Sequence, residues 1–165
     1  IAQGRLGPGR FQYAMGFVGM AQRCLELMCA RAQERVAFGE PLIKKTSIQH
    51  EIARSRCDIE QCRLLTLQAA EVMDREGLDG ARPYISMIKI VAPKMAQEVA
   101  DRAMQIFGGM GLTTDLPVEK LWRDMRSMMI TEGPEVRMAT PEQLWKITRS
   151  IVIVARSLLL LVMCS

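Results

Sequence analysis

Three clusters in this sequence have residue types and spacings that could do chemistry. The first is the segment Gln105–Gly111 (QIFGGMG), whose glycines stand where a helical pattern ends and the chain changes direction. Because glycine lacks a Cβ, this backbone can turn sharply and offer its N–H groups to a phosphate. The same pattern is typical of an ordinary helix C-cap at Gly108, so both interpretations stay open at this point.

The other two clusters carry charge. Arg35 and Phe38 close the first helical pattern, where a guanidinium suits bidentate phosphate contact and a ring can stack on a heterocycle. Glu132, followed by Gly133 and Pro134, offers a carboxylate that acts as a general base once it is desolvated and within reach of a proton. Each cluster also fits an ordinary solvated helix end.

Helical periodicity predicts the elements that must position these clusters. A first helix is expected over about 10–36, with apolar residues at Phe11, Met15, Val18, Leu25 and Met28. A second begins at Thr46, whose side chain caps it while Gln49 closes a capping box, and ends at Gly77 and Gly80. A third covers about 85–106, with a kink at Pro93.

The segment after the glycines predicts a shorter helix. Asp115 is its expected cap, and its apolar stripe continues to Met128. A last helix is expected after Thr140. Since no stretch alternates with β-branched enrichment, strands are not expected. Long helices with short connections predict an all-α, up-and-down helical bundle.

The composition is that of one soluble globular domain. The 165 residues are 49% hydrophobic and 24% charged, and the net charge of +4 is too small and dispersed to indicate nucleic-acid binding. Five cysteines without C-x-x-C spacing predict buried free thiols in a reducing compartment rather than a metal site. The apolar tail Ile151–Cys164 contains Arg156 and is shorter than a membrane span, so a membrane partner is not favoured over a buried helix or an aberrant C-terminus.

In order and spacing, the clusters resemble the C-terminal helical domain of the acyl-CoA dehydrogenase family. The motifs that carry the resemblance are RVAFGEPL at 35–42, QIFGGMG at 105–111, PVEKLWRD at 117–124 and the Glu132-Gly133 pair. The segment DIEQCRLL at 58–65 and Pro134 look most like the branch whose larger members carry an additional kinase-like domain.

The resemblance implies FAD-dependent α,β-dehydrogenation of acyl-CoA thioesters, with Glu132 as the base for the α proton. A minority of the family carries its base at a position that is Gly9 here, which favours Glu132. Substrate contacts are implied at Arg10 and Gly133. Cofactor contacts, partly to the FAD of a neighbouring subunit, are implied at Arg35, Phe38, Thr46, Gln105, Ile106, Phe107, Gly108, Gly109, Pro134 and Glu135.

The resemblance covers residues 4–137, which predicts a helical bundle at 1–137 and a divergent tail at 138–165. It implies a homo-oligomer, acyl-CoA as substrate, electron-transfer flavoprotein as a partner, and a mitochondrial or else peroxisomal role in fatty acid β-oxidation. The chain lacks an initiator Met, a targeting segment and the family's other domains, so we expect a piece of a longer enzyme. The alternatives are a truncated, non-catalytic helical subunit that oligomerises, and a membrane-tethered helical module.

Overall fold

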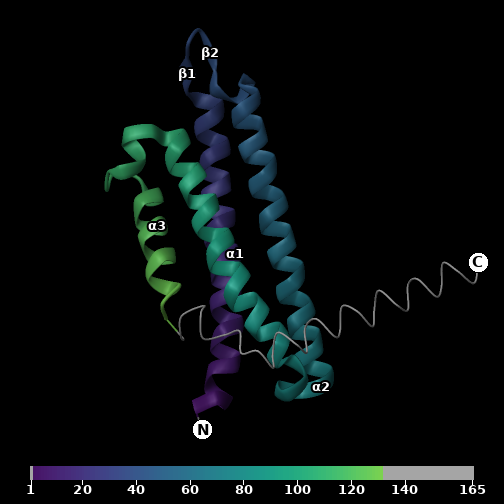
Figure 1. Cartoon of the computed structure of the whole chain (residues 1–165). Coiled ribbons are helices and arrows are strands. Elements are labelled where there is room, and N and C mark those ends of the chain that lie inside the picture. The colour runs from purple at the N-terminus through teal and green to yellow at the C-terminus, as the bar shows by residue number, and fades with distance from the viewer. Residues whose placement is uncertain (1, 132–165) are drawn as a thin grey trace, which may run out of the picture.

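The protein is an all-helical bundle in the computed structural model, which describes residues 2–131 and the side chains from Gly7 onward. Helix α1 (Ala2–Glu34) lies along a much longer helix, α2 (Thr46–Phe107), and the short helix α3 (Pro117–Met128) packs against both (Figure 1). The predicted all-α fold class is confirmed.

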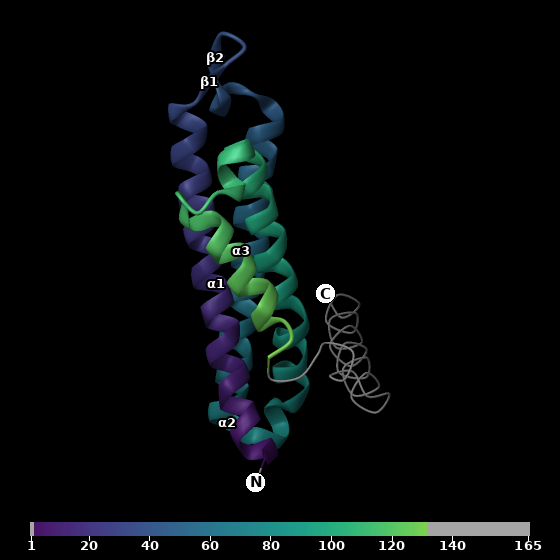
Figure 2. The same cartoon turned by 90° about the vertical axis from the view of Figure 1, so that its left-hand side faces the viewer.

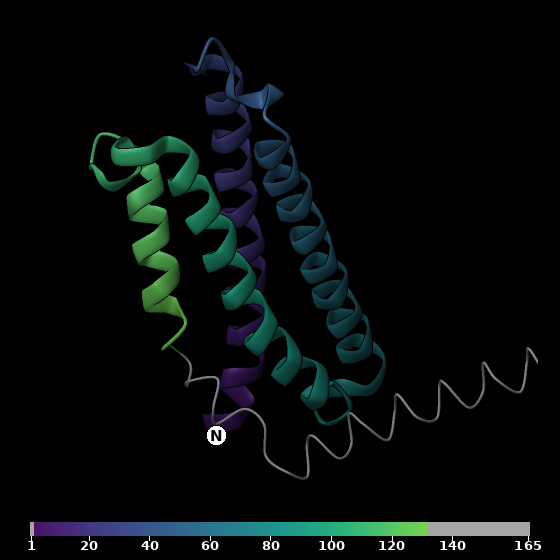
Figure 3. The same cartoon turned by 45° about the horizontal axis from the view of Figure 1, so that its top comes forward.

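A glycine divides α2 into two arms. Gly77 has φ 72° and ψ −171°, which is not helical and which glycine adopts without steric cost. The first arm (46–76) and the second arm (78–107) therefore run antiparallel, as Figure 3 shows. With α1 before them and α3 after them, the chain passes up and down the bundle as the sequence predicts.

A small hairpin joins α1 to α2, although no strand was expected. Strand β1 (Val36–Ala37) pairs antiparallel with β2 (Glu40–Pro41), and a 3-10 turn, η1 (Leu42–Lys44), leads into α2. The loop consists of Phe38 at φ 55° and Gly39 at φ 84°, the left-handed pair that a tight hairpin turn needs. Strands of two residues are too short to show an alternating pattern, which is why the sequence did not reveal them.

The predicted helix caps are wrong. No side-chain hydrogen bond caps α2 at Thr46, and Gln49 instead donates from Nε2 to the carbonyl of Ile43 at 2.9 Å. Helix α3 begins at Pro117 rather than behind an Asp115 cap. Proline has no N–H to satisfy and its φ is already helical, so it can start a helix without a cap.

The first helix is longer and rotated slightly relative to its predicted stripe. It begins at Ala2 instead of about residue 10 and continues over Pro8. Met15, expected in the core, is 44% exposed, whereas Ala14 and Phe17 are buried. The small Ala14 completes the buried stripe, which a count of large apolar residues overlooks. Helix α2 likewise continues through the buried Pro93, and its non-helical residue is Gly77.

The core fills the space between α1, the two arms of α2, and α3. Its largest fully buried side chains come from all of them: Phe17, Met28, Ile59, Ile88, Val99, Val118 and Met125. Because each helix contributes to one contiguous cluster, the second arm and α3 are held in a fixed relation to α1.

The cysteines confirm the thiol prediction only in part. Cys24 and Cys62 are buried, but Cys57 is exposed and Cys29 is half-buried; Cys164 lies outside the described residues. Burial raises the pKa of the Cys24 thiol to about 12. Desolvation disfavours the thiolate, so Cys24 is a packing residue rather than a nucleophile.

Candidate functional site

The glycine segment and the end of α1 form one cavity of about 480 Å³. Five residues predicted to contact a cofactor line it together with Arg35: Gln105, Ile106, Phe107, Gly108 and Gly109. The tertiary structure therefore joins two clusters about 70 positions apart in the sequence. We call this part of the molecule the glycine end.

Gly108 ends α2, and this changes what the glycine end can offer a ligand. With φ 65°, it donates its backbone N–H to the carbonyls of Met104 and Gln105. That amide is therefore used by the helix and is not available to a phosphate, contrary to the expectation for this residue. What remains is an open surface, because a Cβ built on Gly108 or Gly109 would meet nothing within 4 Å.

Gly111, in contrast, is a packing residue. It lies in the 3-10 helix η2 (Gly108–Leu112), and an added Cβ would stand 2.9 Å from the backbone oxygen of Met104. A side chain there would push η2 away from the last turn of α2. The glycine pattern thus combines a helix cap, an open surface and a close backbone approach.

Arg31 is a functional candidate that the sequence analysis missed. It lines the same cavity as Arg35, one helical turn earlier. Its Nη2 lies 3.7 Å from the Met110 sulfur and its guanidinium 5.7 Å from the centre of the Phe107 ring. Its Nε is buried without a hydrogen-bond partner among the described residues. The i, i+4 spacing of two arginines was the available signal.

Phe38 stands apart from the cavity at the tip of the hairpin. It is 93% exposed and is the one residue other than glycine with positive φ in the described part of the chain. Holding a bulky side chain in the left-handed region costs about 1–2 kcal/mol. The Nζ of Lys45 lies 5.9 Å from the centre of the Phe38 ring. The predicted contact residue Thr46 is exposed and is not part of the lining of the cavity at the glycine end.

A second cavity adjoins the glycine end, but its charge differs. It measures about 800 Å³, shares Gln105 and Gly108 with the first, and is lined by the carboxylates of Asp101 and Glu119. Trp122 donates its indole N–H to Asp101, which ties α3 to α2. Two carboxylates repel a phosphate, so the cavity with two arginines is the one that suits an anion.

Arg102 fixes the second arm just before the glycine end. Its side chain is 11% exposed and reaches Asp58 at 2.8 Å and Glu51 at 3.2 Å on the first arm, and Glu98 at 3.4 Å on its own arm. A guanidinium with carboxylates on two elements joins them with defined geometry. The glycine end is therefore positioned by an ion-pair network as well as by the core.

The predicted substrate residue Arg10 lies far from this cavity. It is half-buried on α1 and precedes Arg31 by about 30 Å at 1.5 Å per residue. The predicted base Glu132, together with Gly133, Pro134 and Glu135, lies outside the described residues. These five assignments stay predictions.

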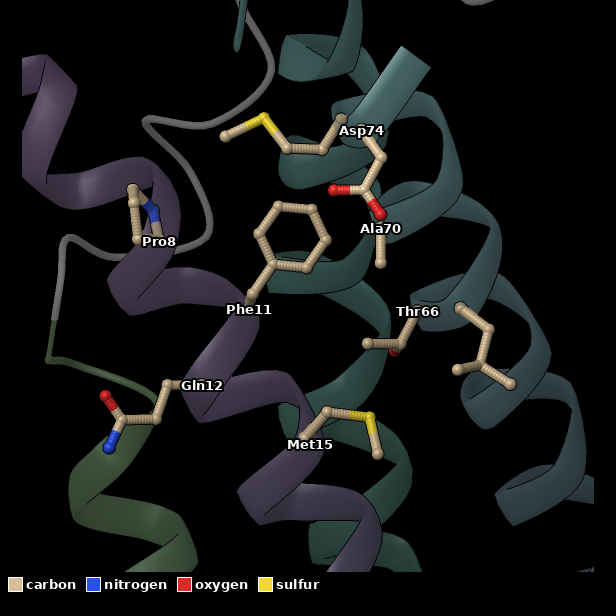
Figure 4. Close-up of a pocket in the computed structure, with 9 residues that line it drawn as sticks. Pro8, Phe11, Gln12, Met15, Thr66, Ala70 and Asp74 are labelled. Atoms are coloured by element: carbon tan, nitrogen blue, oxygen red, sulfur yellow. The ribbon is translucent and has the colours of Figure 1, made fainter. Parts of the chain in front are cut away.

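An apolar groove of about 450 Å³ lies between α1 and the first arm, near the Arg10 level of α1 (Figure 4). Phe11 and Met15 line it from α1, and Thr66 and Ala70 line it from α2, with Asp74 at one end. Its polar groups are few, so it suits an apolar surface rather than a charged ligand.

Two kinds of feature are absent from residues 2–131. Within that range no cluster of His, Cys, Asp and Glu side chains could hold a metal ion. None of the helices described there has the length and apolarity needed to cross a membrane.

Comparison with known proteins establishes the class. Residues 1–140 match the family described as acyl-CoA dehydrogenase, C-terminal domain. The chain therefore belongs to the acyl-CoA dehydrogenase family and corresponds to its C-terminal helical domain.

The individual relatives are much longer than this chain. Acyl-CoA dehydrogenase family member 11 of Rattus norvegicus is 46% identical over 135 residues, which are 82% of this chain and 17% of the relative. A solved structure from Mycobacterium abscessus superposes with a TM-score of 0.84 at 41% identity, covering 92% of this chain and 37% of that one. A glutaryl-CoA dehydrogenase from Mycobacterium smegmatis in complex with FADH2 gives 0.76 at 25% identity, over 81% and 34% of the two chains.

Proposed function

We propose that this chain is the C-terminal part of an FAD-dependent acyl-CoA dehydrogenase and that the glycine end contacts the adenosine and pyrophosphate of FAD. The observation that carries the proposal is the cavity in which Arg31 and Arg35 face the segment 105–109. Membership of the family and a relative's structure with FADH2 support it.

The residues at the glycine end fit this cofactor. Arg31 and Arg35 would meet the negative charge of the pyrophosphate, and the buried Nε of Arg31 is a donor still available to an acceptor. The open surface at Gly108 and Gly109 admits a close approach, while Phe38 offers a face for stacking. When bound, the flavin would accept the hydride removed from the β carbon of the acyl group.

The proposed proton transfer would take place away from the glycine end, near the level of Arg10 on α1. Glu132 would remove the α proton of the thioester, and Arg10 and Gly133 would contact the substrate. Desolvation by the bound acyl chain would raise the basicity of the carboxylate. The remaining flavin contacts would come from parts of the enzyme beyond these 165 residues. A homo-oligomer and electron-transfer flavoprotein would be the partners, with a mitochondrial location.

A hybrid enzyme tests the proposal. This chain replaces the matching segment of the rat relative, and flavin absorbance is followed after acyl-CoA is added. We expect the flavin to co-purify and to be bleached by substrate, and Glu132→Gln to abolish the bleaching while leaving the flavin bound. A Glu132→Gln hybrid with full turnover would show that the base assignment is wrong.

A second candidate is a non-catalytic helical subunit, and the apolar groove of Figure 4 favours it. A second copy of this chain or an intact dehydrogenase chain would cover the groove. Sedimentation of the isolated chain separates the two: a monomer that stays monomeric with dehydrogenase chains present argues against the subunit role.

A further inference from the structure

Lys89 is the only charged side chain in the buried class within residues 7–131. It is 2% exposed and lies on the second arm, far in sequence from any of its acceptors. Its Nζ donates to the backbone carbonyl of Thr131 at 2.7 Å, of Met129 at 3.3 Å and of Met128 at 3.4 Å. One ammonium therefore binds three carbonyls at the end of α3.

The end of α3 needs such a partner. The last carbonyls of a helix accept no hydrogen bond from within the helix. They carry partial negative charge, which a cation complements. Many helices meet this need with a left-handed glycine, but Met129 follows α3 with φ −59° and ψ −31°, which is still right-handed. Lys89 supplies the termination from a different element of the fold.

The position of these bonds along the chain is the important point. The shortest of the three bonds goes to the carbonyl of Thr131, the last residue that the structure describes before Glu132 in the sequence. The bonds therefore extend past α3 into the turn at residues 129–131. Burying an ammonium costs free energy, and here the buried ammonium binds the residue next to the predicted base.

The same end of α3 is packed against α1. A Cβ built on Gly16 would lie 4.0 Å from the Met128 methyl carbon, and Figure 2 shows α3 descending alongside α1 toward its N-terminal half. Arg10 lies on that half of α1. The end of α3 that Lys89 binds therefore lies beside the N-terminal half of α1, the half that carries the predicted substrate contact.

We propose that Lys89 is a positioning residue for the base Glu132: by holding the end of α3 it fixes the peptide from which the carboxylate reaches the substrate. This inference rests on the proposed function, which names Glu132. Lys89 itself would touch neither substrate nor cofactor. Small displacements of a reacting group lower the rate of the chemical step far more than they lower binding.

Hydrogen exchange on the 165-residue chain tests the anchor itself. Lys89→Met keeps an apolar stem of similar length and removes the donors, and Lys94→Met on the exposed face of the same arm is the matched control. We expect the Met129 and Ile130 amides, which close the last turn of α3, to exchange about tenfold faster in Lys89→Met alone. Equal exchange in the two variants would overturn the anchor.

Turnover in the hybrid enzyme tests the consequence for catalysis. Lys89→Met should lower kcat about 10- to 100-fold and change KM little. The isotope effect on kcat with substrate deuterated at the α carbon should rise, since proton removal becomes more rate-limiting. Lys89→Arg, which keeps the charge, should recover part of kcat. Flavin content and circular dichroism show whether the variant is folded. If Lys89→Met does not fold, Lys89→Gln replaces it and is measured in the same way.

The two proposals can fail separately. Unchanged kcat and isotope effect in a folded Lys89→Met hybrid, with Glu132→Gln inactive, would overturn the positioning role and leave the proposed function standing. Full turnover in Glu132→Gln would remove the base and with it the catalytic role of Lys89, whatever the exchange data show.

Discussion

The glycine end and the Lys89 anchor solve opposite problems with the same helix. At the end of the second arm, Gly108 leaves an open cavity in which Arg31 keeps a buried donor without a partner in the described structure. About five turns earlier on that arm, Lys89 is closed off from solvent and its ammonium is bound to three carbonyls. The glycine end leaves a hydrogen-bond donor for a group from outside the chain. The Lys89 ammonium, in contrast, is bound by carbonyls of the chain itself.

This difference suggests how a shared active site can be divided between surfaces. A cofactor site that is open and basic can be finished by other domains or by a neighbouring subunit. The proposed proton transfer would tolerate less displacement than a cofactor contact, which is the role proposed for the contacts of Lys89 with the end of α3. Substitutions in each region test whether the two regions differ in this way.

The largest effect is expected at the glycine end. In the hybrid, Arg31→Met should weaken FAD binding about 10- to 100-fold, because a hydrogen bond to a charged group contributes about 1.5–3 kcal/mol. Excess FAD should restore turnover, whereas it should not restore turnover in Lys89→Met. Fluorescence titration with FAD measures the affinity, and Arg23→Met, on the exposed face of α1, is the control. Identical affinities in the two variants would mean that Arg31 does not meet the cofactor.

The glycines of the same segment should separate packing from binding. Gly111→Ala should destabilise the isolated chain by about 1–3 kcal/mol, because its Cβ would stand 2.9 Å from the Met104 carbonyl oxygen. Gly109→Ala, which meets nothing within 4 Å, should change stability little and affect only FAD binding in the hybrid. Urea unfolding measures both, and equal losses would contradict the division.

A smaller effect, of opposite sign, is expected at the hairpin. Phe38→Asn creates an Asn-Gly turn and relieves the left-handed strain at Phe38, so the isolated chain should become more stable by about 1 kcal/mol. FAD binding by the hybrid should weaken at the same time. Leu112→Asn, another exposed apolar residue without positive φ, should not stabilise. A stabilised Phe38→Asn hybrid with unchanged FAD affinity would leave Phe38 outside the cofactor site.

The smallest effect concerns α1 and the first arm of α2, outside the two regions. Cys57 is exposed, and its alkylation by iodoacetamide should leave the unfolding free energy unchanged. Cys24 should stay unmodified in the folded chain at pH 8, since burial raises its pKa to about 12 and almost no thiolate forms. Peptide mass mapping follows both sites. Rapid alkylation of the Cys24 thiol without denaturant would indicate that the bundle opens at Cys24.

Some of this protein was determined by its sequence alone. The helical periodicity indicated the all-α bundle, Gly77 marked the reversal in α2, and the glycines at 108 and 109 marked the cavity at the glycine end, because these features depend on local backbone preferences. The motifs were sufficient to indicate the family, which the comparison confirmed.

Tertiary structure decided the rest. Thr46 and Asp115 are residue types that often cap helices, but no side-chain hydrogen bond caps either helix start in the structure. Lys89 gave no local signal and Arg31 gave only its i, i+4 spacing with Arg35, since a guanidinium or ammonium is ordinary on a helix until its neighbours are known. Whether such a charge faces solvent, an open cavity or the carbonyls of a distant helix depends on packing between elements, and local sequence does not encode that packing.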